Sequence, residues 1–323
     1  MIEDLICPHC HSKLNLAGDE RGLACDRCKS FYEALDGIPI MIREELPLQV
    51  KRLKELYDEK GFQEDIRDTL LGIRRIAGEH SVGKIVDTNL LLVKPYLHGK
   101  RILEVGCGMG QLTEKLCSAD CQVYAFDLSF KNAIFTKKYR ASKDSLIFVG
   151  NALEIPFPGN HFDVVISSEV IEHVPDEHKM IEEMKRVCKE GGIICLSTPN
   201  ANIIFYPKIL LMIFLRPWIW MKRLKRKADW SGLGVYDRWI FPKTIKKWVR
   251  WHGLQLVVHR TAIFYYWRSP IYLLCLLLEK LGFKMDRFFS RYLFITDLLI
   301  EKNIPFLKNM GIRQFLLARR LRS

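Results

Sequence analysis

Apolar runs alternate with amphipathic stretches in the middle of the chain, from about residue 100 to residue 200. Five runs have the length and composition of buried strands, at residues 101–105, 122–126, 146–149, 163–167 and 192–197. The stretches between them carry apolar residues at helical spacing, at residues 110–118, 129–139 and 176–189. This alternation predicts right-handed crossovers and a doubly wound parallel α/β sheet, whose ligands bind at the carboxyl ends of the strands.

Further elements are predicted on both sides of this core. Residues 44–98 are rich in Glu, Lys, Arg, Leu and Ile at helical spacing, which predicts two or three helices that form a linker or cap. Beyond the core at residues 99–200, the rest of the fold occupies residues 201–323. A helix ending near residue 252, a strand at 254–261 and a closing antiparallel strand at 313–320 are expected there. Two apolar insertions, at about 203–230 and 264–311, interrupt this half.

Four of the ten cysteines form two CxxC pairs near the N-terminus. Fourteen residues separate Cys7 and Cys10 from Cys25 and Cys28, and they can form a hairpin that brings the pairs together. Four thiolates complete a closed tetrahedral zinc site, so residues 1–43 are predicted to be a small domain with a structural zinc. The other cysteines follow no spacing pattern, which favours a reduced compartment.

Charge is divided unevenly along the chain, whose formal net charge is +13. Residues 1–200 contain 26 Lys and Arg against 31 Asp and Glu, whereas residues 201–323 contain 24 against 6. A basic partner surface is therefore expected in the C-terminal part. An apolar fraction of 49% with 27% charged residues excludes a disordered or low-complexity chain.

Neither a secretory signal nor a membrane-spanning helix is predicted. The chain begins Met-Ile-Glu-Asp-Leu, without an apolar stretch, and the apolar region at 203–221 is interrupted by Pro207, Lys208, Arg216 and Pro217. A spanning helix needs about 20 consecutive apolar residues. We therefore expect a cytoplasmic protein that is peripheral on the membrane.

A glycine-rich turn follows the first core strand. Glu104 lies two residues before a GxGxG sequence made of Gly106, Gly108 and Gly110, after which the first core helix begins. Glycine permits the sharp turn and lets the backbone approach a ligand closely. Asp127 ends the second strand, where its carboxylate can accept hydrogen bonds from two ribose hydroxyls. The spacing of this turn differs from the GxGxxG of dinucleotide-binding enzymes.

Together with residues 148–158 and 162–168, this turn resembles class I S-adenosylmethionine-dependent methyltransferases over about residues 85–200. The resemblance implies a seven-stranded Rossmann-like sheet and S-adenosylmethionine as the cofactor. Residues 1–43 resemble the zinc ribbons that partner and activate methyltransferases. The implied cofactor contacts are Glu104, Gly106, Gly108 and Gly110 at the methionine end, Asp127 at the ribose, and Asn151 and Ala152 at the adenine.

The stretch after the fourth strand is expected to lie beside the reactive methyl group. Glu169, Glu172 and His173 form an ExxEH arrangement, which resembles quinone-biosynthesis O-methyltransferases and small-RNA 2′-O-methyltransferases. That resemblance implies that all three bind a divalent cation such as Mg²⁺, which would activate an acceptor hydroxyl. A second interpretation stays open, in which Glu169 touches the cofactor, Glu172 is solvated, and His173 packs in the loop or acts alone as a general base.

The C-terminal third combines apolar segments with cations. Trp218 and Trp220 lie in an apolar stretch that a cluster of Lys and Arg at 222–227 follows directly. This order predicts a helix that lies on an anionic bilayer, with ordinary substrate-domain core or RNA phosphate binding as alternatives. We expect an amphiphilic acceptor, namely a lipid, an isoprenoid or a lipid-linked glycan.

The favoured hypothesis is an S-adenosylmethionine-dependent O-methyltransferase that acts at the cytoplasmic membrane face. The main alternative is an rRNA or tRNA methyltransferase that uses the zinc ribbon for recognition, although the ribbon-bearing half of the chain is acidic. A third hypothesis is a non-catalytic scaffold, and the intact glycine turn and Asp127 argue against it.

Overall fold

The computed structural model describes residues 1–17, 22–43, 45–60, 73–201, 238–262 and 313–322, with a few further positions between 274 and 291. The predicted insertion at about 203–230, with its membrane-surface helix, lies outside the described residues, as does most of the insertion at 264–311. Among the helices of the described part, none is both long and apolar enough to cross a membrane.

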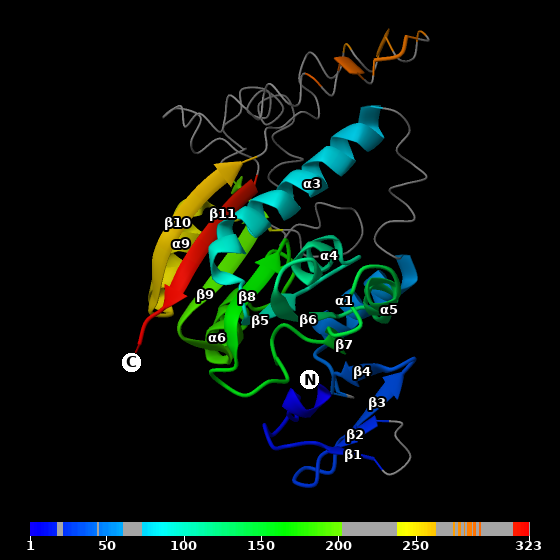
Figure 1. Ribbon diagram of the computed structural model, residues 1–323, viewed down its shortest axis with the longest axis vertical. Coiled ribbons are helices and arrows are strands. Elements are labelled where there is room, and N and C mark those ends of the chain that lie inside the picture. Colours follow the sequence, from blue (N-terminus) through cyan, green and yellow to red (C-terminus); the bar gives the residue numbers. More distant parts are fainter. Residues whose placement is uncertain are drawn as a thin grey trace.

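A parallel sheet forms the centre of the molecule (Figure 1). All five core strands were predicted, and buried apolar side chains on both faces explain why they are continuous apolar runs. The fifth strand starts earlier than expected, because Cys188 is buried and pairs with Phe162, so the preceding helix ends at Val187. The strands are β5 (Lys100–Val105), β6 (Cys121–Asp127), β7 (Leu146–Gly150), β8 (Phe162–Ser168) and β9 (Cys188–Pro199).

Two C-terminal strands complete the expected seven. β11 (Arg313–Arg320) lies between β9 and β10 (Leu254–Ala262) and is antiparallel to both, which confirms the predicted closing strand. The order is therefore β7-β6-β5-β8-β9-β11-β10. β10 forms the outer edge of the sheet on this side (Figure 1).

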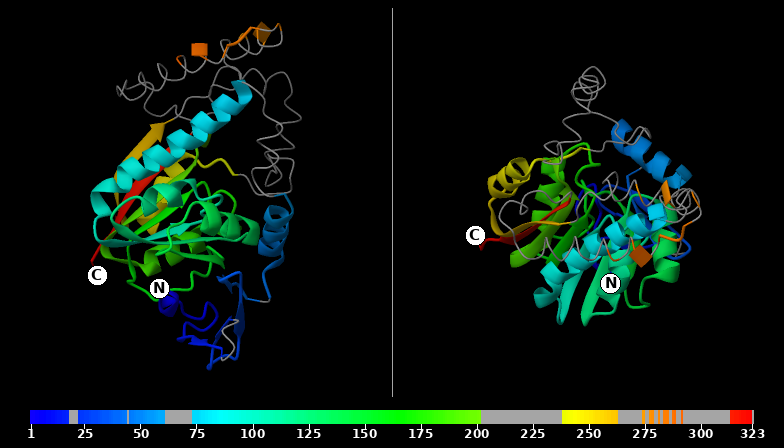
Figure 2. Two further views of the ribbon diagram at one scale, coloured as in Figure 1. Left: turned by 45° about the vertical axis from the view of Figure 1, so that its right-hand side comes forward. Right: turned by 90° about the horizontal axis from the view of Figure 1, so that it is seen from above.

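Helices cover both faces of the sheet, as a doubly wound fold requires. One face packs against α3 and α4, and the other against α6 and α9. Figure 2 shows α3 and α9 on opposite sides of the strands. A further helix, α1, packs against α5 near β7. The helices are α1 (Leu48–Lys60), α3 (Ile73–Val93), α4 (Gln111–Cys117), α5 (Phe130–Tyr139), α6 (Glu177–Val187) and α9 (Pro242–Trp251).

The N-terminal ribbon is a continuation of the same sheet, which the sequence did not predict. Its last strand runs parallel to β7, with Ile40 opposite Val149 and Met41 opposite Gly150. Within the described residues, this pairing extends seven strands to eleven. The ribbon strands are β1 (Asn15–Leu16), β2 (Gly22–Ala24), β3 (Phe31–Leu35) and β4 (Ile38–Met41).

Side chains and backbone groups outside the strands also tie the ribbon to the core. The Ile6 amide donates to the Pro156 carbonyl at 2.9 Å, and the buried Tyr124 hydroxyl donates to the Asp4 carboxylate at 2.7 Å. Buried ribbon residues such as Tyr32 belong to the same apolar cluster as Tyr124. The ribbon and the central sheet are therefore packed as one folded unit.

Candidate functional site

The glycine-rich turn lies between β5 and α4, at the carboxyl end of the central strand. Gly106, Gly108 and Gly110 have φ values of 74°, 52° and 76°, which glycine adopts without steric cost. A Cβ on Gly106 would lie 2.3 Å from Cγ2 of Val170, whereas a Cβ on Gly108 would meet nothing within 4 Å. The turn thus packs against the loop after β8 at Gly106, and at Gly108 it leaves room for a ligand.

Asp127 ends β6 beside this turn. Its Oδ2 accepts a hydrogen bond from the Gly108 amide at 2.9 Å, and its Oδ1 accepts from the Ser129 amide at 2.9 Å and Asn132 Nδ2 at 3.1 Å. Burial raises the pKa of Asp127, and these three donors oppose that rise. The carboxylate is thereby fixed in orientation next to the opening at Gly108.

Glu104 is buried, with 2% of its surface exposed. Its carboxylate accepts a hydrogen bond from Thr113 Oγ1 at 2.6 Å. Burial is the main cause that raises the pKa of Glu104 to about 8, and the nearby charge of Asp127 raises it further, whereas Thr113 lowers it. Glu104 therefore links the end of β5 to α4 in a site that favours its neutral form.

Asn151 and Ala152 follow β7 and are both buried, with exposed fractions of 6% and 9%. The side-chain carbonyl of Asn151 accepts a hydrogen bond from the Leu153 amide at 3.1 Å. This contact is an Asx turn, which fixes the direction of the loop that leaves β7. The ribbon strand β4 pairs with the last residues of β7, directly before this loop.

A carboxylate from α1 also belongs to this region, and the sequence analysis missed it. Asp58 Oδ1 accepts hydrogen bonds from the Phe130 amide at 3.0 Å and from Ser129 Oγ at 2.8 Å, at the start of α5. The charge of Asp58 adds to the rise in the pKa of Asp127. Nothing distinguishes Asp58 from the other charged residues of α1 in the sequence, because its role depends on long-range packing.

The loop after β8 holds Glu169, Glu172 and His173, but their side chains have different partners. Glu169 has a φ of 57°, which is uncommon for a residue other than glycine, and its carboxylate forms an ion pair with Arg313 at 2.5 Å. Glu172 is 1% exposed and accepts a hydrogen bond from Thr198 Oγ1 at 3.0 Å. His173 is 24% exposed, and its Nε2 lies 4.0 Å from Glu172 Oε1.

These positions do not fit the divalent cation that the ExxEH resemblance implied. Within the described residues, the N-terminal cysteines are the only group of three or more potential ligands whose ligand atoms lie close together. The Glu169 carboxylate is instead paired with Arg313, and the Glu172 carboxylate accepts a hydrogen bond from Thr198 Oγ1. The interpretation in which Glu172 is solvated is wrong, because the side chain is buried.

Two chain segments from the C-terminal half meet this loop. The Arg238 amide donates to the Glu172 carbonyl at 3.3 Å, and Arg313, the first residue of β11, pairs with Glu169. Each arginine follows one of the two apolar segments that the sequence analysis singled out. Arg238 and Arg313 therefore lie beside the residues that are expected to act on the acceptor.

The four N-terminal thiols form the second candidate site. Their Sγ atoms all lie within 4.8 Å of one another, with 3.5 Å between Cys7 and Cys28 and 3.4 Å between Cys10 and Cys25. A tetrahedral zinc ion with bonds of about 2.3 Å separates its sulfur ligands by about 3.8 Å, so this cluster could bind zinc. The carbonyls of Cys7 and Cys25 each accept from the amide four residues later, at 2.8 and 2.9 Å, so the two pairs form equivalent knuckles.

Comparisons with known proteins agree with this geometry. The methyltransferase domain family matches residues 103–196. The ubiquinone biosynthesis O-methyltransferase of Burkholderia thailandensis is 32% identical over 166 residues, which cover 50% of this chain and 67% of that protein. The demethylmenaquinone methyltransferase of Bacillus mycoides is 28% identical over 172 residues, which cover 51% of this chain and 69% of that protein. The chain spans about two thirds of the length of these curated relatives.

Solved structures share the fold at low sequence identity. A complex of the Haloferax volcanii Trm112 methyltransferase activator with a methyltransferase has a TM-score of 0.53 at 14% identity, over 84% of this chain and 98% of that chain. The magnesium protoporphyrin IX methyltransferase of Synechocystis with bound SAH has a TM-score of 0.51 at 14% identity, over 84% of this chain and 99% of that chain. At this identity the likeness concerns the fold alone.

Proposed function

Since the chain belongs to the class I S-adenosylmethionine-dependent methyltransferases, we propose that it methylates a hydroxyl group of an amphiphilic isoprenoid acceptor, such as a quinone precursor. The O-methyltransferase relatives support this reaction class. The observation that carries the acceptor class is the meeting of Arg238 and Arg313 with the Glu169–His173 loop. In the sequence each arginine follows a long apolar segment, and this favours an acceptor with an apolar tail.

The cofactor would be held by the glycine turn and by the ends of the neighbouring strands. The opening at Gly108 fits a group that lies against backbone, and the fixed carboxylate of Asp127 fits a ribose with two hydroxyls. Glu104 would support the turn from within the fold, and Asn151 and Ala152 would shape the adenine end. When bound, S-adenosylmethionine supplies a methyl group on a positively charged sulfur.

His173 is the group that we expect to accept the acceptor hydroxyl proton. Its side chain is 24% exposed, whereas the Glu169 carboxylate is paired with Arg313. Glu172 is 1% exposed, and burial raises its pKa, which favours the neutral acid. Glu169 would act through the backbone, because its ion pair with Arg313 and the hydrogen bond from its amide to the Ser197 carbonyl at 3.0 Å hold the loop. No divalent cation is required for these roles.

The thiol cluster is proposed to hold a structural zinc. With four cysteine ligands there is no open position for catalysis, so the ion would stabilise the ribbon and with it β4. Because β4 pairs with β7 next to Asn151, zinc would support the adenine end of the site through the backbone.

We place the reaction at a membrane surface, since a long isoprenoid chain partitions into the bilayer and the C-terminal half of the protein is basic and apolar. An rRNA or tRNA acceptor is the competing outcome.

The test is transfer of a labelled methyl group from S-adenosylmethionine to defined acceptors. We expect methylation of a polyprenylated catechol in detergent micelles, weaker methylation of a catechol without the isoprenoid tail, and none of bulk RNA. His173→Asn should abolish turnover and retain S-adenosylmethionine binding, whereas His98→Asn, at an exposed position, should change neither. Methylation of RNA alone would refute the acceptor class, and full activity of His173→Asn would refute the assigned base.

A further inference from the structure

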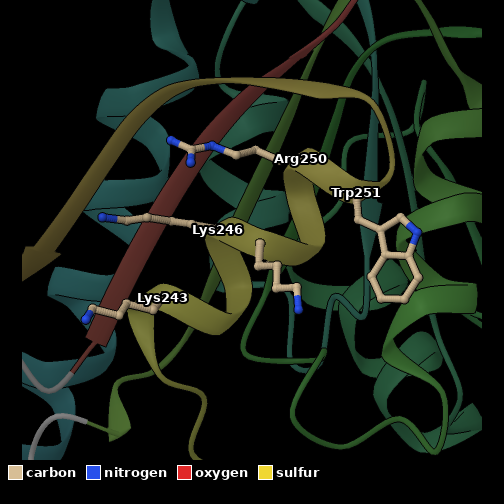
Figure 3. Close-up of a pocket in the computed structure, with 5 residues that line it drawn as sticks. Lys243, Lys246, Arg250 and Trp251 are labelled. Atoms are coloured by element: carbon tan, nitrogen blue, oxygen red, sulfur yellow. The ribbon is translucent and has the colours of Figure 1, made fainter.

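α9 has a cationic face that the proposed methyl-transfer site does not use. One side of this helix is buried in the core through Pro242, Ile245 and Val249. The other side lines a shallow depression, and Figure 3 shows Lys243, Lys246 and Arg250 extending side by side while Trp251 turns to the other side of the helix. The depression is lined by Lys243, Lys246, Lys247, Arg250 and Trp251.

The positive charge of this face is not balanced by acidic residues of its own segment. Residues 238–262 contain six Lys and Arg and no Asp or Glu. A neighbouring depression shares Trp251 and adds Lys185, Arg186 and Arg320 to it, with Glu182 as the acidic residue that lines it. Glu182 lies 4.0 Å from the ammonium of Lys179, so its charge is partly compensated by α6 itself.

Exposed aromatic side chains lie at both ends of α9. Trp251 at the end of α9 is 71% exposed, and Phe241 directly before the helix is 42% exposed. A helix of ten residues is about 15 Å long, and the four cations lie between these two aromatic residues in the sequence. Leu321, 52% exposed, follows Arg320 at the Trp251 end.

We propose that the α9 face, defined as Lys243, Lys246, Lys247 and Arg250 with the exposed Phe241 and Trp251 at the two ends of the helix, docks the protein on an anionic membrane surface. Cations along one side of a helix, with exposed aromatic residues at the ends of that helix, suit the headgroup region of a bilayer. A shallow surface with exposed apolar side chains suits a flat lipid interface better than a nucleic-acid strand, which proteins bind in a positively charged groove.

The position of α9 connects this surface to the acceptor side of the fold. The helix begins four residues after Arg238, whose amide contacts Glu172 in the loop after β8. A membrane that contacts the start of α9 would therefore lie close to the edge at which the acceptor is proposed to enter. This inference rests on the proposed amphiphilic acceptor. It assigns the membrane contact to α9, which lies outside both apolar segments of the sequence.

The test is binding of the full-length protein to vesicles, measured by sedimentation without acceptor or turnover. Vesicles of phosphatidylcholine with one third phosphatidylglycerol should retain the protein, and pure phosphatidylcholine should retain far less. Neutralising two cations in Lys246→Gln/Arg250→Gln should lower the partition coefficient roughly 30-fold, at about 1 kcal/mol per cation. The matched control, Lys138→Gln/Lys143→Gln on exposed positions outside α9, should bind like the wild type.

Binding of S-adenosylmethionine, measured by calorimetry, must be unchanged in both double variants, which shows that they are folded. Vesicle binding by the wild type that the α9 variant retains in full would overturn the α9 assignment and leave the proposed function intact. Failure of the wild type to bind anionic vesicles would instead contradict the membrane part of the proposed function. A loss of binding in α9 variant and control alike would also count against α9.

Discussion

Replacing Glu104 by Gln should remove a pH dependence from the stability of this fold. The carboxyl is 2% exposed, and its pKa is about 8 in the folded protein against an ordinary value of 4.5. Because the folded state holds the proton more tightly than the unfolded chain, the stabilising contribution is complete below pH 4.5. It is lost progressively as the pH rises to about 8. Gln keeps an oxygen that can accept from Thr113 and has no proton to lose.

The size of the effect follows from the difference between the two pKa values. Each pH unit within this window changes the free energy of unfolding by about 1.4 kcal/mol. Between pH 5 and pH 8, Glu104 alone should therefore lower the stability of the wild type by about 4 kcal/mol. The charge of Asp127 contributes to the raised pKa of Glu104, and Asp127 is expected to contact the cofactor. The measurement should therefore use cofactor-free protein.

Urea unfolding of both proteins at intervals from pH 5 to pH 9 measures this quantity directly. The cysteine ligands and the other carboxylates titrate in both proteins, so the difference between them isolates position 104. Glu114→Gln is the control, because Glu114 is half-exposed and pairs with Arg140 at the surface. A difference in unfolding free energy between Glu104→Gln and wild type that stays constant from pH 5 to pH 8 would refute the reasoning.

Three further perturbations test other parts of the structure. Zinc removal by a chelator should lower both the melting temperature and the S-adenosylmethionine affinity, because structural zinc supplies about 10 kcal/mol or more of folding free energy and β4 supports β7. The control Cys117→Ser should leave both quantities unchanged. An unaltered affinity after chelation would contradict the coupling between the zinc site and the cofactor site. Asp127→Asn should weaken cofactor binding roughly 10- to 100-fold in calorimetry, as expected for a hydrogen bond to a charged group, whereas Asp163→Asn, at the start of β8, should not. Arg313→Gln should lower kcat with little change in the Kd of the cofactor, since it removes the ion pair that holds Glu169. Arg319→Gln, at the far end of β11, is the control. A kcat of Arg313→Gln equal to that of the wild type would show that the ion pair is dispensable.

The apolar runs were sufficient to predict the five parallel strands and the place of the glycine turn, and the resemblance to methyltransferases implied the two further strands that complete the seven. A strand that is covered on both faces needs apolar side chains at successive positions, so β5 to β9 are visible in the sequence as continuous apolar segments. The positions of Gly106 and Asp127 at the carboxyl ends of neighbouring strands follow directly from that strand order.

Contacts between distant parts of the chain could not be predicted in this way. Asp58 contacts the start of α5, which lies 71 residues later in the chain. Glu169, in the loop after β8, pairs with Arg313 at the start of β11, which is also distant in sequence. A charged residue that is later buried has the same sequence signature as a solvated one, so the burial of Glu172 was missed. Tertiary packing decides the environment of such a carboxylate, and this environment decides whether the carboxylate can bind a cation.

The pairing of β4 with β7 has a consequence for the order in which the chain can fold during synthesis. Met41 leaves the ribosome 109 residues before its partner Gly150, a delay of roughly 5 to 20 s at ordinary elongation rates. During that interval an already formed ribbon would expose the edge of β4 to other nascent chains. Pro39 lies in the middle of β4 and lacks the N–H that a foreign strand would need. The ribbon can thus wait for its own sheet with little risk of pairing with another chain.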